Sequence, residues 1–219
     1  GKSVEGTALV AMINIENVTY KYPGSEAPAL DGFSACFERG EITAVRGKNG
    51  CGKTTLTKLA VGILRPAKGR VLIDGTDNSG LDLFEIGRMV GYIFQNPNNQ
   101  LFCDTVFNEV AYGLIHSGQR SEKVEYYLEY FGLSRYRDDY PGILSLGEKQ
   151  RLALAAVLSL GTDYLILDEP TTGLDVYWRG ELGSTLRKLQ RDTGCGIVIV
   201  SHEIDFISRY ADRELVMTR

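Results

Sequence analysis

Apolar residues form short continuous runs in two parts of the chain, before residue 95 and after residue 162. Such runs between polar or glycine-rich stretches are typical of strands buried on both faces. Between these two parts, apolar residues recur at helical spacing, as at Val124, Leu128 and Phe131. The pattern predicts buried strands towards both ends of the chain and a helical insert between them. The predicted strands are 42–45, 70–73, 90–94, 164–167 and 197–200.

Turn residues and helical periodicity complete this pattern. Residues 13–40 are expected to form two strands around the turn-rich stretch 23–28, with Met12 opening the first strand. Helices are expected at 54–64 and at 176–191. Strands that alternate with helices pair in parallel, so the predicted fold class is α/β with a mostly parallel sheet.

The length of the chain predicts a single domain. A chain of 219 residues lies within the size of one domain and buries enough surface to fold without a disulfide or a metal. The predicted domain spans 12–219, with a core at 12–95 and 162–219 and a helical subdomain at about 96–161. Residues 1–11 show no clear period and are expected to be a linker or a remnant of one.

Charge and cysteine content narrow the possible functions. The chain has 24 basic and 28 acidic residues, a net charge of −4, and this balance argues against a nucleic-acid partner. Its four cysteines are scattered, with no C-x-x-C spacing, so neither a zinc site nor a disulfide framework is expected, and a reducing cytosolic setting fits. No apolar run approaches the roughly 20 residues that cross a bilayer.

A glycine-rich loop at 47–55 carries the strongest chemical signal. It fits the pattern G-x-x-x-x-G-K-[ST], and it lies between a predicted strand and a predicted helix, as the motif requires. Glycines let the backbone wrap around a phosphate, while N–H groups and a helix N-terminus face the anion. Lys53 is expected to reach the β- and γ-phosphates, and the Thr54 hydroxyl to bind Mg²⁺. The expected nucleotide-binding residues are Asn49, Gly50, Cys51, Gly52, Lys53, Thr54 and Thr55.

Two acidic residues end the buried run 164–167. In open α/β sheets, ligands lie beyond the carboxyl ends of strands, so Asp168 and Glu169 are expected near the glycine-rich loop. Adjacent residues on a strand point in opposite directions, and the two acids can therefore take different roles. Asp168 is expected to hold Mg²⁺, directly or through water, and Glu169 to polarise the attacking water.

Further motifs resemble the ATP-binding-cassette (ABC) ATPases. Residues 144–151, Leu-Ser-Leu-Gly-Glu-Lys-Gln-Arg, resemble the signature motif usually written LSGGQ. Residues 172–175 resemble the D-loop of that family, and 199–202 its switch-histidine segment. Gln95 matches the glutamine of the Q-loop, and Tyr22 the aromatic residue that stacks on adenine. All of these motifs follow the order and spacing of the family.

The resemblance implies a RecA-like P-loop core with a mostly parallel sheet, an antiparallel β subdomain and an inserted helical subdomain. It also implies that ATP is hydrolysed between two cassettes packed head to tail, each glycine-rich loop facing the partner's signature motif. Ser145, Gly147 and Glu148 would then meet the nucleotide of the partner, and Asp175 would cross the interface. Gln95 and His202 would serve catalysis, with Gln95 also near Mg²⁺. Ser145 with Glu148 three residues later further predicts a capping box.

Some residues depart from the family pattern. Leu146 replaces a usual glycine and is expected to add bulk near the partner's nucleotide, while Glu148 replaces a usual glutamine and adds negative charge there. Each change could slow ATP hydrolysis at one of the two sites that form between paired cassettes. Cys51 stands where serine is common, either as an inert small residue or as a thiol with a lowered pKa. Arg46 stands where an apolar residue is common, and the sequence offers no reason for it.

Residues 95–102 and 105–113 resemble energy-coupling-factor (ECF) ATPases, which drive uptake of vitamins and of cobalt or nickel ions. The resemblance implies a peripheral protein at the cytoplasmic face of the membrane. An integral-membrane subunit would dock near Gln95–Phe107, where Leu101, Phe102 and Phe107 could line a groove. Phe107 is equally expected in the core of the subdomain.

Two other functions remain open at this stage. The chain could be a cassette of a soluble ABC ATPase of the translation or DNA-repair type, cut from a longer chain. It could also be a non-catalytic nucleotide-binding partner, although its own site keeps Gln95, Asp168, Glu169 and His202.

Overall fold

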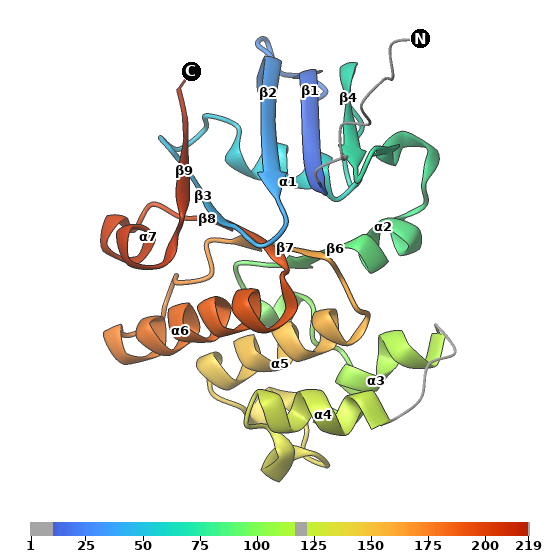
Figure 1. Cartoon of the computed structure of the whole chain (residues 1–219), viewed down its shortest axis with the longest axis vertical. Coiled ribbons are helices and arrows are strands. Elements are labelled where there is room, and N and C mark those ends of the chain that lie inside the picture. The colour runs from blue at the N-terminus through green and yellow to red at the C-terminus, as the bar shows by residue number, and fades with distance from the viewer. Residues whose placement is uncertain (1–10, 117–121, 219) are drawn as a thin grey trace, which may run out of the picture.

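The computed structural model describes residues 11–116 and 122–218. The expected linker at 1–11 lies outside these residues except for its last position. Two sheets and a set of helices form three layers, with the antiparallel strands at one end of the molecule and the helices α3 to α6 at the other (Figure 1). The parallel sheet lies between them.

Five strands form the parallel sheet in the order β6-β7-β8-β3-β9, and every neighbouring pair is parallel. This result confirms the expected α/β class. Four of the strands coincide with predicted apolar runs, and the fifth, β9, was not predicted. The strands are β3 (Ile42–Gly47), β6 (Val90–Ile93), β7 (Tyr164–Asp168), β8 (Gly196–Val200) and β9 (Arg213–Met217).

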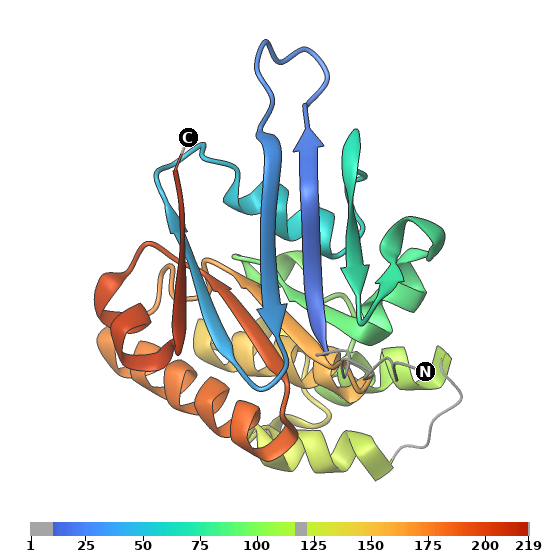
Figure 2. The same ribbon diagram turned by 45° about the horizontal axis from the view of Figure 1, so that its top comes forward.

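An antiparallel sheet in the order β2-β1-β4-β5 packs over one face of the parallel sheet. The first two strands are long and run side by side, as Figure 2 shows. The first strand opens at Met12, as expected. The strands are β1 (Met12–Tyr20), β2 (Leu30–Glu38), β4 (Lys68–Ile73) and β5 (Thr76–Asp77).

The helices begin and end for local reasons. The helix α1 (Lys53–Ala60) stops earlier than the predicted 54–64, because Gly62 lies in the left-handed region at φ 71° and the chain turns there. The helix α2 (Leu83–Met89), which was not predicted, opens with a capping box between Asp82 and Glu85. The other helices are α3 (Val106–His116), α4 (Glu122–Tyr130), α5 (Leu146–Ser159), α6 (Val176–Thr193) and α7 (Ile204–Tyr210), and the 3₁₀ turns are η1 (Asn78–Gly80), η2 (Pro97–Asn99), η3 (Ser134–Tyr136) and η4 (Pro141–Ile143).

Alternation along the strands divides the core in two. On β7, Leu165 and Leu167 face a cluster with the helices α3 to α6, whereas Tyr164 and Ile166 face a cluster with α1 and the antiparallel sheet. Because the central strands are buried on both faces, their carboxyl ends are held rigidly between two packed layers. Those ends carry the residues of the candidate site.

Candidate active site

A cleft of about 620 Å³ opens at the carboxyl ends of β3, β6, β7 and β8. Its walls come from segments that are far apart in the sequence, which the parallel sheet brings together. The predicted site residues that line it are Tyr22, Asn49, Gly50, Gly52, Lys53, Thr54, Thr55, Gln95, Asp168, Glu169 and His202.

The loop between β3 and α1 forms the floor of this cleft. Gly50 and Gly52 adopt φ angles of 79° and 100°, which L side chains rarely adopt. A Cβ on Gly52 would also lie 2.7 Å from the carbonyl oxygen of Ala29, so glycine is required there for space as well. Lys53 donates from its Nζ to the carbonyl oxygens of Gly47 at 2.8 Å and Lys48 at 3.3 Å. The ammonium group and the N-terminus of α1 together favour a bound anion.

The Cys51 side chain is buried and packs against the backbone of this loop at Gly47. The residue is 7% exposed, and a Cβ added to Gly47 would lie 2.5 Å from its sulfur. Its backbone N–H donates to the Lys48 carbonyl oxygen at 3.2 Å. The thiol is therefore a packing group beneath the loop, which agrees with the inert interpretation of this residue.

Arg46 has a structural explanation. Its guanidinium pairs with the Glu214 carboxylate at 2.8 Å, across the parallel pairing of β3 with β9. Because β9 was not predicted, the partner of Arg46 could not be found from the sequence. The ion pair lies beside the cleft, and both side chains are about one-third exposed (32% and 38%).

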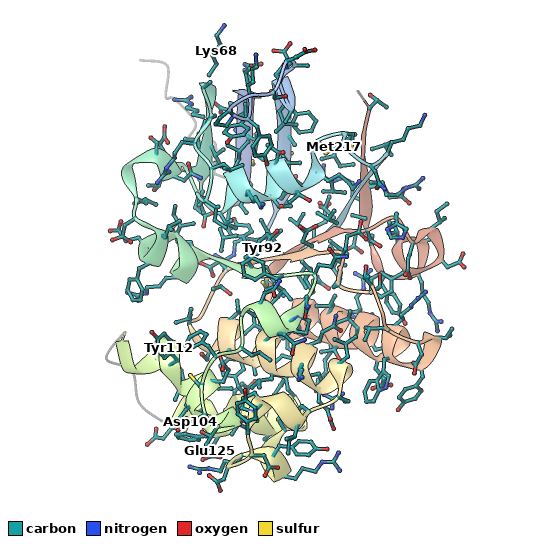
Figure 3. The ribbon with its side chains drawn as sticks, turned by 180° about the vertical axis from the view of Figure 1, so that it is seen from behind. Lys68, Tyr92, Asp104, Tyr112, Glu125 and Met217 are labelled. Carbon is teal, nitrogen blue, oxygen red and sulfur yellow. The ribbon has the colours of Figure 1, made fainter. Side chains whose placement is uncertain are left out.

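At the opposite wall, Asp168 ends β7 and accepts a hydrogen bond from the Tyr92 hydroxyl at 3.0 Å. Tyr92 lies on β6 at the middle of the molecule (Figure 3), and its hydroxyl is also 3.4 Å from that of Thr57 on α1. Burial and the Asp168 charge raise the pKa of Tyr92, so its hydroxyl stays a donor at neutral pH. Tyr92 thus fixes the carboxylate, a role that the sequence analysis missed.

Glu169 and His202 meet at the edge of the cleft. The Glu169 backbone adopts a φ of 49°, unusual for a residue with a side chain, and its N–H donates to the Val200 carbonyl oxygen at 2.8 Å. This turn directs the carboxylate towards His202, whose Nδ1 lies 2.9 Å from Glu169 Oε2. Two of the four residues named for catalysis, the others being Gln95 and Lys53, are therefore in direct contact.

The cleft also contains the oxygen atoms that a divalent cation prefers. Thr54 supplies a hydroxyl, Gln95 an amide oxygen and Asp168 a carboxylate, and all three residues line the cleft. This donor set fits Mg²⁺, which binds few protein oxygens and keeps water and phosphate as its other ligands. In the described ranges, no group of three or more His, Cys, Asp or Glu residues forms a separate metal site.

Tyr22 lies at the mouth of the cleft. It is 38% exposed, and its hydroxyl lies 3.2 Å from that of Thr55 on α1. The Tyr20 ring packs against it edge to face, with centroids 4.9 Å apart. A planar base stacked on Tyr22 would therefore lie directly above the start of α1.

The predicted signature segment forms the start of α5. Ser145 and Glu148 form the expected capping box. Glu148 is largely buried, which opposes ionisation, but hydrogen bonds from Tyr136, Ser145 and Arg135 outweigh burial and lower its pKa to about 2. The negative charge that Glu148 adds is thus compensated within the chain.

Leu146, Gly147 and Asp175 pack against the chain itself. The Leu146 side chain is partly buried against the core, and a Cβ on Gly173 would lie 3.4 Å from it. Leu146 thus packs partly on its own chain, and the bulk that it was expected to add near a partner's nucleotide stays a prediction. A Cβ on Gly147 would lie 3.0 Å from the Trp178 ring, and Asp175 caps α6 by accepting from the Trp178 N–H at 2.9 Å.

These two groups of residues remain apart. Among the described residues, the cleft around Lys53 takes none from the segment 144–151 and does not include Asp175. Within one chain, the structure therefore brings together the glycine-rich loop, the acids, Gln95 and His202, but leaves the signature segment on a separate surface.

Comparison with known proteins identifies the family. A family model described as ABC transporter matches residues 30–172, which is more than half of the chain. The chain belongs to the ABC transporter family. It carries the ATP-binding domain of these ATPases. The matched span contains the glycine-rich loop, Gln95 and the segment 144–151, whereas Tyr22, Asp175 and His202 lie outside it.

Individual relatives and solved structures show which members of the family this chain resembles. The energy-coupling factor transporter ATP-binding protein EcfA of Methanothermobacter thermautotrophicus is 42% identical over 94% of this chain and 68% of its own length. The structure of cbiO1 from Clostridium perfringens, part of the ABC transporter complex cbiONQ, is 33% identical with a TM-score of 0.87, over 95% of this chain and 85% of that one. A dimeric post-hydrolysis structure of the ATP-binding cassette MJ0796 with ADP and Pi is 26% identical with a TM-score of 0.81, over 94% of both chains.

The relatives differ in length. A relative from Methanosarcina acetivorans is 42% identical over 93% of this chain but is matched over only 33% of its own length. The chain therefore corresponds to about a third of some curated relatives and to most of others.

An exposed aromatic pair marks the helical part of this ABC domain. Phe102 is 66% exposed and packs edge to face on Tyr112, with ring centroids 4.8 Å apart. Tyr112, visible on α3 in Figure 3, was not predicted. Phe107 is half-buried against the core beneath the Arg137 guanidinium, 4.0 Å from its ring centre, so the structure favours the core role for it.

A buried carboxylate holds this pair in place. Glu109, 4% exposed, accepts hydrogen bonds from the backbone N–H groups of Phe102 at 2.9 Å and Cys103 at 2.8 Å. Gln100 accepts a further one from the Phe94 N–H at 2.9 Å, next to Gln95. The loop from Gln95 to Phe102 is thereby tied at both ends.

Proposed function

We propose that the chain binds ATP with Mg²⁺ in the cleft and hydrolyses it to power a membrane transporter. The observation that carries this proposal is the Glu169–His202 contact at the edge of a cleft floored by the Lys53 loop. Glu169 accepts a proton from the attacking water, and His202 holds the Glu169 carboxylate and reaches the γ-phosphate. Lys53 and the N-terminus of α1 stabilise the charge on the phosphates.

Thr54, Gln95 and Asp168 hold Mg²⁺ in this proposal, and the ion neutralises charge on the phosphate oxygens when bound. Tyr92 keeps the Asp168 carboxylate directed at that position. Tyr22 stacks on the adenine, and the N–H groups from Asn49 to Thr55 surround the phosphates.

The catalytic assignment is tested by Glu169→Gln. We expect hydrolysis to fall by about 100-fold or more, as for loss of a central catalytic group. ATP affinity should stay near that of the wild type, because the amide keeps the size of the side chain. Glu129→Gln, which changes an exposed carboxylate on α4 that does not line the cleft, serves as the matched control. Turnover of Glu169→Gln at the rate of the control would show that Glu169 is not the base.

We infer that the working unit is a pair of cassettes packed head to tail. The cleft holds only the residues of one half-site, and the MJ0796 cassette that this chain resembles is dimeric with ADP and Pi. Specific activity should therefore fall as the protein is diluted. Activity per molecule that stays constant far below the concentration at which the chain associates would contradict this arrangement.

We further propose that the transporter is an ECF-type importer of a vitamin or a transition-metal ion. The likeness to EcfA and to cbiO1 of the cbiONQ complex supports this proposal. In the described part of the chain, no helix is long and apolar enough to cross a membrane. In this proposal the membrane-spanning part is a separate integral-membrane subunit. It would dock on the Phe102–Tyr112 pair beside Gln95, within the segment 96–161 that we propose as the helical subdomain, and would hold the chain at the cytoplasmic face.

Co-purification from membranes tests the proposed partner. The wild-type chain should recover an integral-membrane protein, and Phe102→Asp should lose it while still binding ATP. Tyr126→Asp, at a comparably exposed aromatic residue on α4, should keep it. Recovery of ribosomes in place of a membrane protein would favour a soluble ABC ATPase instead.

A further inference from the structure

The Ser145 hydroxyl is already engaged within its own chain. Its oxygen lies 2.7 Å from Glu148 Oε2, and the same carboxylate oxygen accepts the Ser145 backbone N–H at 3.0 Å. The Glu148 side chain is ionised at neutral pH and can only accept, so the hydroxyl hydrogen of Ser145 points at Glu148. The serine oxygen also accepts the Glu148 backbone N–H at 3.4 Å, so its hydrogen and one of its lone pairs are both used within its own chain.

The carboxylate is fixed from its other side. Glu148 Oε1 accepts hydrogen bonds from the Tyr136 hydroxyl at 2.6 Å and from the Arg135 guanidinium at 3.3 Å. Both donors come from η3, which is a different part of the helical region from α5. With a side chain only 12% exposed and four donors around it, Glu148 has no free position to which it can rotate.

A phosphate oxygen accepts hydrogen bonds and cannot donate them when ionised, and the same is true of the carboxylate. We propose that Glu148 competes with the γ-phosphate of the partner's nucleotide for the single Ser145 hydroxyl hydrogen. Glu148 is thus a positioning residue that sets how tightly this signature segment holds a second cassette. The inference rests on the proposed head-to-tail arrangement. It adds that Glu148, on the chain that supplies the signature segment, regulates how tightly the two cassettes associate.

Two features of the site strengthen the competition. A hydrogen bond to an ionised acceptor is roughly twice as strong as one between neutral groups, so the phosphate must replace a strong bond. The Glu148 carboxylate, whose charge is paired with Arg135, also bonds both the hydroxyl and the backbone N–H of Ser145, so the phosphate must displace a group that is held at two points. Tyr136 and Arg135 hold that charge in place, so it does not swing away when a nucleotide approaches.

The experiment measures ATP-driven association of the purified chain in a Glu169→Gln background, where hydrolysis does not remove the nucleotide. Glu148→Gln keeps an amide oxygen for the Ser145 N–H but makes the acceptor neutral. We expect the ATP concentration for half-maximal association to fall by about fivefold, because a neutral acceptor holds the hydroxyl less strongly. Analytical ultracentrifugation at fixed protein concentration measures the shift.

The chain offers a matched control in its second capping box. Glu85 bonds the Asp82 backbone N–H at 2.9 Å on α2, outside the cleft and the signature segment, as Glu148 bonds that of Ser145. Glu85→Gln should leave the half-maximal ATP concentration unchanged. A second comparison uses Ser145→Ala, in which Glu148→Gln should have no further effect, since the carboxylate acts through the hydroxyl.

The outcomes separate this inference from the proposed function. If the chain associates with ATP but Glu148→Gln matches Glu85→Gln, the competition is wrong and the head-to-tail proposal stands. An equal shift from Glu148→Gln in the Ser145→Ala background also overturns the inference, because the effect would then not pass through the serine. If no variant associates at any ATP concentration, the head-to-tail proposal fails, and this inference fails with it.

Discussion

The cleft and the signature segment of this ABC domain differ in how their polar groups are used. In the cleft, Lys53, Gln95 and Asp168 come from distant parts of the sequence and line an open space of about 620 Å³. In the signature segment, Ser145 is bonded to Glu148, three residues away, and Asp175 caps its own helix. The cleft is an open space lined by polar groups, whereas in the proposed pair the signature segment would have to exchange an internal bond for an external one.

This difference implies an order of events. A nucleotide can enter the cleft of a single chain without breaking the capping bonds of α5 or α6. In the proposed head-to-tail pair, engagement of the signature segment comes second, and contacts with the partner and its nucleotide must then offset the lost internal bonds. The two regions should therefore respond differently to mutation.

The largest contrast is expected in ATP binding to the isolated chain. Lys53→Ala should weaken binding by about 100-fold or more, roughly 3 kcal/mol, because a charge-assisted contact to phosphate is lost. Ser145→Ala should change binding by less than about twofold, since Ser145 does not line the cleft. Isothermal titration calorimetry at a concentration where the chain is monomeric measures both. Similar losses in the two variants would remove the distinction between the regions.

A smaller contrast lies within the glycine-rich loop. Gly52→Ala should destabilise the fold by about 2–3 kcal/mol, because the added Cβ combines a left-handed backbone with overlap onto Ala29. Gly50→Ala should cost only about 1 kcal/mol, because no described atom lies within 4 Å of its Cβ position. Urea unfolding compares the two variants, and equal costs would show that space at Gly52 does not matter.

The last contrast concerns the pH dependence of the signature segment, and it appears only under acidic conditions. The pKa of Glu148 is lowered to about 2, so its contribution to stability is complete above the unfolded value near 4.5. That contribution, on the order of 2 kcal/mol, should be lost as the pH falls from about 4.5 towards 2. The difference in unfolding free energy between wild type and Glu148→Gln, measured from pH 7 to 3, should shrink below pH 4.5. A difference in unfolding free energy that stays constant over this pH range would show that ionisation of Glu148 does not cause it.

Much of the fold follows from local sequence patterns. The buried strands β3, β6, β7 and β8 have continuous apolar runs, and the capping box at Ser145 has its own short signature. The strand β9 was missed because its residues alternate between charged and apolar, and its pairing with β3 depends on long-range packing. The capping signal at Asp82 and Glu85 was available and would have located α2.

The features of the site that were not predicted depend on where individual side chains point. The glycine-rich loop and its acids were identified because their chemistry is tied to fixed spacing. The Tyr92 bond to Asp168 joins two neighbouring strands, and Leu146 packs beside Gly173, which is far from it in the sequence, so neither contact can be deduced from spacing alone. Tertiary contacts, which decide where a side chain points, are not encoded in a local pattern.

The left-handed backbone of Glu169 links chemistry to the durability of the molecule. A side chain at φ 49° costs on the order of 1 kcal/mol, and the chain bears this strain where the carboxylate must face His202. A glycine at 169 would relax the backbone but would remove the carboxylate that we propose as the base. Selection for stability alone would therefore favour glycine at this position. That a glutamate is present instead indicates that its side chain serves a function that costs the protein some stability.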